Sequence, residues 1–144
     1  ISKLKFDFNR RDLIVKEQQE ELIEKAIKAR QKAYTPYSEF KVGAAVLTAA
    51  GNIYTGCNIE NSAYSVSNCA ERTAIFKAVS EGERDIKAVA VVADQSEPTT
   101  PCGSCRQVIS EFGDDIEVIM TNLDGDRVVK TIDELLWGAF KLKE

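Results

Sequence analysis

The segment from residue 86 to residue 93, Ile-Lys-Ala-Val-Ala-Val-Val-Ala, restricts the fold of this chain more than any other. Apart from Lys87 its side chains are apolar, so a strand here is apolar on both of its faces. Such a strand is stable only in the middle of a sheet that helices cover on both sides. The rest of the chain must therefore supply helices for two faces.

Apolar periodicity and turn residues predict those helices and the other strands. Between residues 16 and 34 apolar side chains recur every three or four positions, which is typical of an amphipathic helix. Ser67 or Asn68 is the expected N-cap of the next helix. The predicted elements are, in order, helix 16–34, strands 42–47 and 53–57, helix 69–82, strand 86–93, helix 102–113, strands 116–121 and 127–130, and a short helix 131–136.

This order of elements predicts an α/β fold, a three-layer α/β/α sandwich around a mixed five-stranded sheet. The turn Ala50-Gly51-Asn52 joins the first two strands into a hairpin. At 144 residues the chain is long enough for one packed domain. We expect that domain to span residues 17–144, with residues 1–16 as an N-terminal extension of unknown role.

Charge and hydropathy limit the expected partners. The net charge is −4 and the pI is near 5.0, so no nucleic acid is expected to bind and the substrate is expected to be small. No segment approaches the roughly 20 apolar residues of a membrane span, and residues 1–6 lack a signal-peptide core. We therefore expect a cytoplasmic protein without a membrane partner, in which the presence of four cysteines favours metal binding or catalysis over a disulfide framework.

Two short motifs contain the residues suited to chemistry. Cys69-Ala70-Glu71 comes at the start of one predicted helix, and Pro101-Cys102-Gly103-Ser104-Cys105 at the start of another. The chain has no histidine, which excludes histidine-based triads and histidine zinc ligands. Three thiolates suit a zinc ion that keeps its fourth position open, as catalytic sites do. We predict one Zn²⁺ per chain, bound by Cys69, Cys102 and Cys105.

Glu71 and Arg72, which follow Cys69, are suited to assist a metal ion held by the thiolates. Glu71 stands two residues from a predicted ligand, close enough to move protons at the metal without binding it. Arg72 is expected to donate to a ligating sulfur and offset its charge, and Arg106 is a weaker candidate for that role. The simpler alternatives are a helix-dipole role for Glu71 and solvated arginines. Cys57 is expected to pack as a small apolar residue, because a fourth thiolate would close the site.

With these residues in place, the chain resembles the cytidine deaminases of the small, homotetrameric, all-cysteine zinc type. The superfamily motif is a His or Cys two residues before a Glu, followed by Pro-Cys-x-x-Cys. The resemblance covers roughly residues 22–140. It implies hydrolytic deamination of cytidine and 2′-deoxycytidine to uridine or deoxyuridine and ammonia, in pyrimidine salvage. Hydroxide held by zinc would attack C4 of the base while Glu71 shuttles protons.

The resemblance also implies roles for residues in the runs 37–44 and 56–61. Phe40 would pack against the nucleoside, and the backbone of Ala70 would help to hold the base. Asn58 and Glu60 would bind the ribose hydroxyls, and an amide and a carboxylate on alternate residues can together hold a diol. The simpler alternative for Asn58 is a turn residue after a strand.

By the same resemblance, each pocket is completed by a neighbouring subunit. Phe140 would stack on the neighbour's base, and Tyr64 would approach its sugar. An aromatic residue near the end of the chain equally suits its own core. Trp137 stands where the family commonly has proline, so the turn before Phe140 is expected to differ.

Three alternatives remain open at the level of sequence. A deaminase of a modified nucleoside such as blasticidin shares Cys-Ala-Glu and Pro-Cys-Gly-x-Cys, but the run Asn58-Ile59-Glu60-Asn61 argues against it. A polynucleotide-editing deaminase would need a basic or aromatic groove, which the acidic balance disfavours. A noncatalytic zinc-stabilised module is the alternative outside the enzymes.

Overall fold

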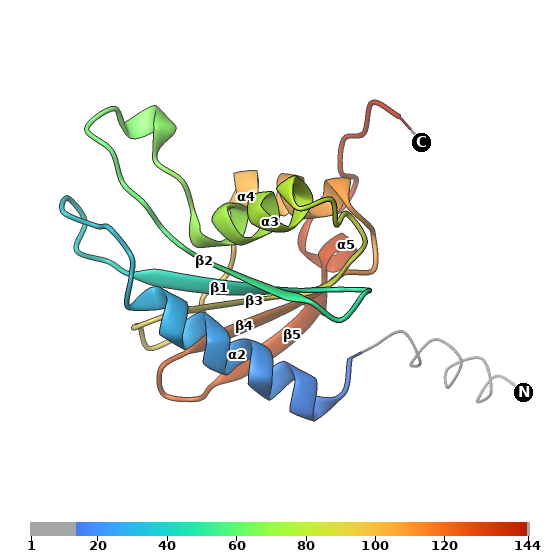
Figure 1. The fold of residues 1–144 in the computed structure, drawn as a ribbon, viewed down its shortest axis with the longest axis horizontal. Helices are drawn as coiled ribbons and strands as arrows, with labels where there is room; N and C mark the ends of the chain where they lie inside the picture. Colours follow the sequence, from blue (N-terminus) through green and yellow to red (C-terminus); the bar gives the residue numbers. More distant parts are fainter. Residues whose placement is uncertain (1–13, 144) are drawn as a thin grey trace, which may run out of the picture.

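In the computed structural model, which describes residues 14–143, a mixed five-stranded sheet has helices on both faces (Figure 1). The strand order is β2-β1-β3-β4-β5, with β3 and β4 parallel and the other neighbouring pairs antiparallel. The predicted fold class is confirmed. The elements are α2 (Lys16–Arg30), β1 (Val42–Thr48), β2 (Ile53–Cys57), a 3₁₀ turn η1 (Tyr64–Val66), α3 (Ala70–Ser80), β3 (Ile86–Ala93), α4 (Gly103–Glu111), β4 (Glu117–Asn122), β5 (Arg127–Thr131) and α5 (Ile132–Leu135).

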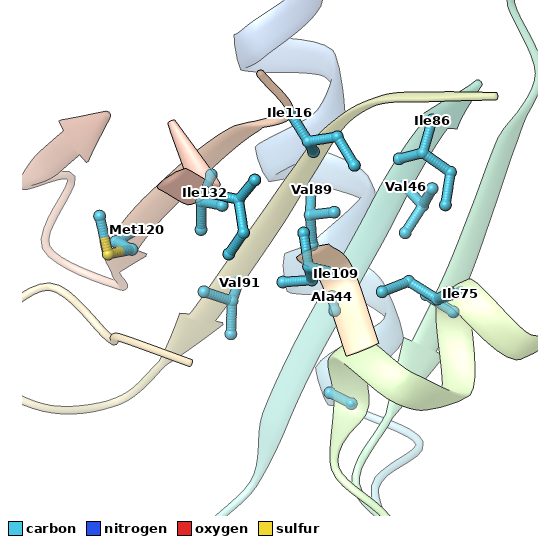
Figure 2. Close-up of a cluster of buried hydrophobic side chains, with 13 residues drawn as sticks. Ala44, Val46, Ile75, Ile86, Val89, Val91, Ile109, Ile116, Met120 and Ile132 are labelled. Atoms are coloured by element: carbon cyan, nitrogen blue, oxygen red, sulfur yellow. The ribbon is translucent and has the colours of Figure 1, made fainter. Parts of the chain in front are cut away.

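The central strand β3 takes part in two apolar cores, one on each face of the sheet. Val89 and Val91 belong to the core beneath α3, α4 and α5, and Ala88, Ala90 and Val92 to the core beneath α2. Figure 2 shows the first core, where Ile75 of α3 and Ile109 of α4 lie over the strands. Each fully buried aliphatic side chain contributes about 1.5–3 kcal/mol. None of the described helices has the length and apolar content needed to cross a membrane.

Two glycines allow helices to approach the β1–β2 hairpin closely. A Cβ atom on Gly43 would lie 2.0 Å from the carbonyl oxygen of Ala26 in α2. On the opposite face, a Cβ atom on Gly56 would lie 2.5 Å from the Ala74 nitrogen and 2.6 Å from the Ala70 oxygen in α3. Gly56 therefore determines how closely the first turn of α3, which follows Cys69, packs on the sheet.

The structure corrects two details of the sequence-based prediction. The N-cap of α3 is Cys69, and neither Ser67 nor Asn68 occupies that position. Asn68 instead exchanges backbone hydrogen bonds with Ile59, and its side chain donates to Thr73 Oγ1 at 3.1 Å. The first helix ends at Arg30 and not at residue 34, because the chain turns so that the Tyr34 amide donates to the Asn58 carbonyl.

Candidate active site

The N-terminal ends of α3 and α4 bring three cysteine thiols together. Cys69 and Cys102 are the N-caps of these helices, and Cys105 lies in the first turn of α4. All three sulfur atoms lie within 4.8 Å of one another, and Cys69 Sγ is 3.7 Å from Cys102 Sγ. Tetrahedral zinc with Zn–S bonds of about 2.3 Å requires an S···S distance of about 3.8 Å. The three thiols therefore fit a zinc ion, and Cys57 is not part of the cluster.

Hydrogen bonds and charge favour the thiolate form of Cys69 within this cluster. A hydrogen bond from Cys105, together with donation by Arg72, lowers the pKa of Cys69 to about 5. Donation to Cys69 and burial raise the pKa of Cys105. Arg72 Nη2 lies 3.2 Å from Cys69 Sγ. The cluster thus holds negative charge next to a fixed guanidinium, which suits a dication.

Arg106, the weaker of the two arginine candidates, lies in a different environment. Its Nε donates to the Pro101 carbonyl at 2.9 Å, and its Nη1 donates to the Leu135 carbonyl at 2.9 Å. These bonds tie α4 to the preceding loop and to the end of α5. The structure therefore places Arg72, and not Arg106, at the sulfur atoms.

Glu71 lies in the first turn of α3 and is almost completely buried, with 4% of its surface exposed. Burial, reinforced by the nearby Cys69 thiolate, raises the pKa of Glu71 to about 7. A carboxyl with a pKa near neutrality can both accept and return a proton. Burial thus gives this residue the property that general acid–base chemistry requires.

A pocket of about 290 Å³ opens beside these residues. It combines residues from the hairpin, the start of α3 and the loop between β3 and α4. Its lining includes six residues singled out from the sequence and four others. The lining consists of Phe40, Asn58, Cys69, Ala70, Glu71 and Cys102, together with Val42, Gln95, Thr99 and Thr100.

Gln95, Thr99 and Thr100 were not predicted from the sequence. They lie in the loop that leads from the end of β3 to Pro101-Cys102. The Thr99 amide donates to the Thr121 carbonyl at 3.0 Å, which holds this loop beside β4. The sequence did contain one indication of their role. A loop that joins a buried strand to a predicted metal ligand has to pass close to the metal site.

Asn58 and Glu60 both hold the segment that contains Phe40. Asn58 Oδ1 accepts from the Val42 amide at 2.9 Å, and its Nδ2 donates to the Phe40 carbonyl at 2.8 Å. Glu60 accepts from the amides of Tyr37 and Ser38 at 3.0 and 3.1 Å and from the Ser38 hydroxyl. The hydroxyl bond is the main cause that lowers the pKa of Glu60. Glu60 is therefore a fixed carboxylate.

Glu60, Tyr64 and Phe140 do not line the pocket beside Glu71 within one chain. Glu60 and Tyr64 border a neighbouring hollow of about 400 Å³, where the Tyr64 ring meets Tyr37 edge to face at 6.1 Å. Tyr64 is 76% exposed and Phe140 is 67% exposed. The Phe140 carbonyl accepts from Gln107 Nε2 at 2.9 Å, which fixes its backbone to α4. Phe140 does not belong to the core of its own chain.

Comparison with known proteins agrees with this geometry. The model of the cytidine and deoxycytidylate deaminase zinc-binding region matches residues 16–121. Cytidine deaminases of Sporosarcina psychrophila and Halalkalibacterium halodurans are 59% and 54% identical, over 87% and 85% of this chain and 93% and 94% of theirs. A blasticidin-S deaminase of Bacillus cereus is 34% identical over 85% of this chain and 91% of its own.

Solved structures show the same similarity. The crystal structure of cytidine deaminase from Burkholderia pseudomallei has a TM-score of 0.82 at 48% identity, covering 88% of this chain and 100% of that chain. Cytidine deaminase from Mycobacterium tuberculosis has a TM-score of 0.74 at 35% identity, covering 90% of this chain and 100% of that chain. Because both the sequence model and the relatives span most of its length, the chain belongs to the cytidine and deoxycytidylate deaminase family.

Proposed function

We propose that this chain is a zinc-dependent cytidine deaminase that hydrolyses cytidine and 2′-deoxycytidine to the uracil nucleosides and ammonia. One observation carries the proposal: three thiols within 4.8 Å of one another lie at a pocket that also contains the buried carboxyl of Glu71. This donor set leaves one tetrahedral position for a reacting molecule. The relatives named cytidine deaminase support the choice of substrate.

The residues of the chain divide the chemistry among them. Cys69, Cys102 and Cys105 would hold the zinc ion, which when bound acts as a Lewis acid that activates water. Glu71 would take one proton from the attacking water and give it to the ring nitrogen, then take the second proton of that oxygen as the carbonyl forms and give it to the leaving amine. Arg72 would draw charge from the Cys69 sulfur, to which it already donates.

The pocket residues would orient the nucleoside. Phe40 offers a partly exposed ring at the pocket, and the first turn of α3 places the Ala70 backbone beside Glu71. Asn58 and Glu60 lie on one extended segment and would bind the ribose hydroxyls. Their existing hydrogen bonds to residues 37–42 mean that they also hold the chain segment that presents Phe40.

We further propose a homotetramer in which each pocket is completed by its neighbours. Tyr64 and Phe140 are aromatic, highly exposed and outside their own chain's pocket. Trp137, which is 92% exposed, lies on the same C-terminal segment and adds apolar surface. Exposed aromatic residues of this kind are typical of protein interfaces. The proposed role is pyrimidine salvage in the cytoplasm, carried out by residues 17–144.

A substrate panel on the zinc-loaded protein tests this function. We expect turnover of cytidine and 2′-deoxycytidine, with much slower turnover of free cytosine, which has no ribose for Asn58 and Glu60. Blasticidin S belongs in the panel because of the relative that is 34% identical. Faster turnover of blasticidin S than of cytidine would reassign the substrate. No turnover of any member with zinc bound would support a noncatalytic zinc module.

A further inference from the structure

Four lysines surround a second pocket at the free edge of the sheet. β2 is an edge strand, and α2 and α3 lie on opposite faces of the sheet beside it (Figure 1). Lys25, Lys28 and Lys32 come from α2 or directly follow it, and Lys77 comes from α3. Residues 55–57 of β2 lie between them, and the pocket measures about 310 Å³. It shares no lining residue with the pocket beside Glu71.

Glu21 and Glu24 lie one helical turn before Lys25 and Lys28 on α2, but neither lines the lysine pocket. No carboxylate is among its lining residues. In the part of the chain that the structure describes, the ion pairs within 4 Å are Arg127–Glu20 and Lys141–Asp114. No described carboxylate therefore lies within 4 Å of the nitrogen atom of any of the four lysines. Like charges three residues apart on a helix repel, as Lys25 and Lys28 of α2 do here.

The concentration of lysines is local and not a consequence of a basic chain. The whole sequence carries a net charge of −4, with 23 acidic and 19 basic residues. A pocket lined by four lysine residues in an acidic protein attracts anions to one place. Its volume lies at the lower end of the usual range for small-molecule sites.

Two hydrogen-bond donors lie at the edge of β2, the Lys77 ammonium and the Thr55 amide. Lys77 Nζ donates to the Thr55 carbonyl at 2.5 Å, which fixes its charge at the strand. The ammonium keeps two more N–H groups for another acceptor. Thr55 is paired with Ala45 on its other side, and the amide and carbonyl of a strand residue point in the same direction. The Thr55 amide therefore faces away from β1, as its carbonyl does.

We propose that this lysine pocket binds a phosphate group, either free or carried by a nucleotide. Lysine binds phosphate as a point charge, and several lysines suit a compact anion with more than one negative charge. A nucleoside without phosphate has no group that would use these charges. The site is therefore distinct from the proposed substrate pocket, and it stands whether or not the proposed activity is correct.

Isothermal titration of the zinc-loaded full chain with inorganic phosphate at low salt tests the proposal. The variant Lys28→Gln/Lys32→Gln removes two charges from the pocket, and Lys16→Gln/Lys130→Gln removes two exposed charges elsewhere. We expect the pocket variant to lose about tenfold or more in affinity, since each lost charged hydrogen bond is worth about that much. The control variant should bind as the unmodified protein does, and added salt should weaken binding in both.

Parallel titrations identify the source of the phosphate. If uridine 5′-monophosphate binds more tightly than inorganic phosphate, and the pocket variant loses affinity for both, the ligand is a nucleotide. If the two affinities are equal, the ligand is free phosphate. Uridine serves as the comparison without phosphate. Absence of phosphate binding, or equal binding by the pocket and control variants, overturns the proposal. Circular dichroism verifies folding, and Lys25→Gln/Lys32→Gln replaces the pocket variant if that variant fails to fold.

Discussion

At the scale of single residues, position decides which cysteines can bind metal. Cys69 and Cys102 cap two helices whose ends converge, whereas Cys57 closes a strand and lines the lysine pocket. The motif spacing predicted this separation. The residues Gln95, Thr99 and Thr100 were not predicted, because a pocket wall depends on how a loop folds back and not on its own composition.

The two kinds of cysteine should respond differently to substitution. Cys102→Ala removes one of three thiolate ligands, so zinc content after dialysis should fall well below one ion per chain and turnover should fall with it. Cys57→Ala, the matched control, should keep the zinc content of the unmodified protein. Metal analysis on purified samples measures both. Zinc loss in Cys57→Ala, or full zinc retention in Cys102→Ala, would show that the ligands are assigned wrongly.

At the scale of secondary-structure elements, close packing of α3 on the hairpin holds Cys69 and Glu71 in place. The sequence predicted the strands and helices well, because the apolar period of each segment is a local property. The N-cap at Cys69 was missed, since Asn68 is a better cap by residue type. A backbone pairing with Ile59, which lies nine residues away, holds Asn68 in the preceding segment.

Gly56→Ala should disturb this packing. The new Cβ atom would lie 2.5 and 2.6 Å from backbone atoms of α3, which cannot rotate away, so the helix has to shift. We expect a loss of about 1–3 kcal/mol in the free energy of unfolding, typical of overpacking. Urea denaturation measures it.

Gly103→Ala provides the control for this substitution. A Cβ atom there meets nothing within 4 Å, so the free energy of unfolding should stay the same or rise slightly. If Gly56→Ala proves as stable as the unmodified protein, α3 is not held by this contact.

At the scale of the whole molecule, the proposed tetramer explains why aromatic residues lie at the surface. Glu71→Ala and Phe140→Ala should each be nearly inactive. If Phe140 completes a neighbour's pocket, mixed oligomers of the two variants contain some pockets with both residues intact. Activity should then rise above the sum of the separate variants after subunit exchange, which a mass-labelled mixture verifies. Verified exchange without a rise in activity would place Phe140 in its own subunit.

The roles of the exposed aromatic residues could not be derived from the sequence pattern or from the structure of a single chain. Tyr64 and Phe140 are highly exposed and do not line the pocket beside Glu71, so neither periodicity nor local packing explains them. Their proposed roles came from resemblance to a family. The layers of the fold and the thiol cluster, in contrast, followed from residue types and their spacing.

The most direct test of the account is zinc content and cytidine turnover measured on one sample of Glu71→Gln. Glutamine keeps the shape of the side chain but cannot take up a proton, and Glu71 is not among the thiol ligands. We predict one zinc ion per chain, as in the unmodified protein, and a turnover about 10²- to 10⁴-fold lower, the usual contribution of a general acid–base group. Turnover near that of the unmodified protein, with zinc retained, would contradict the account.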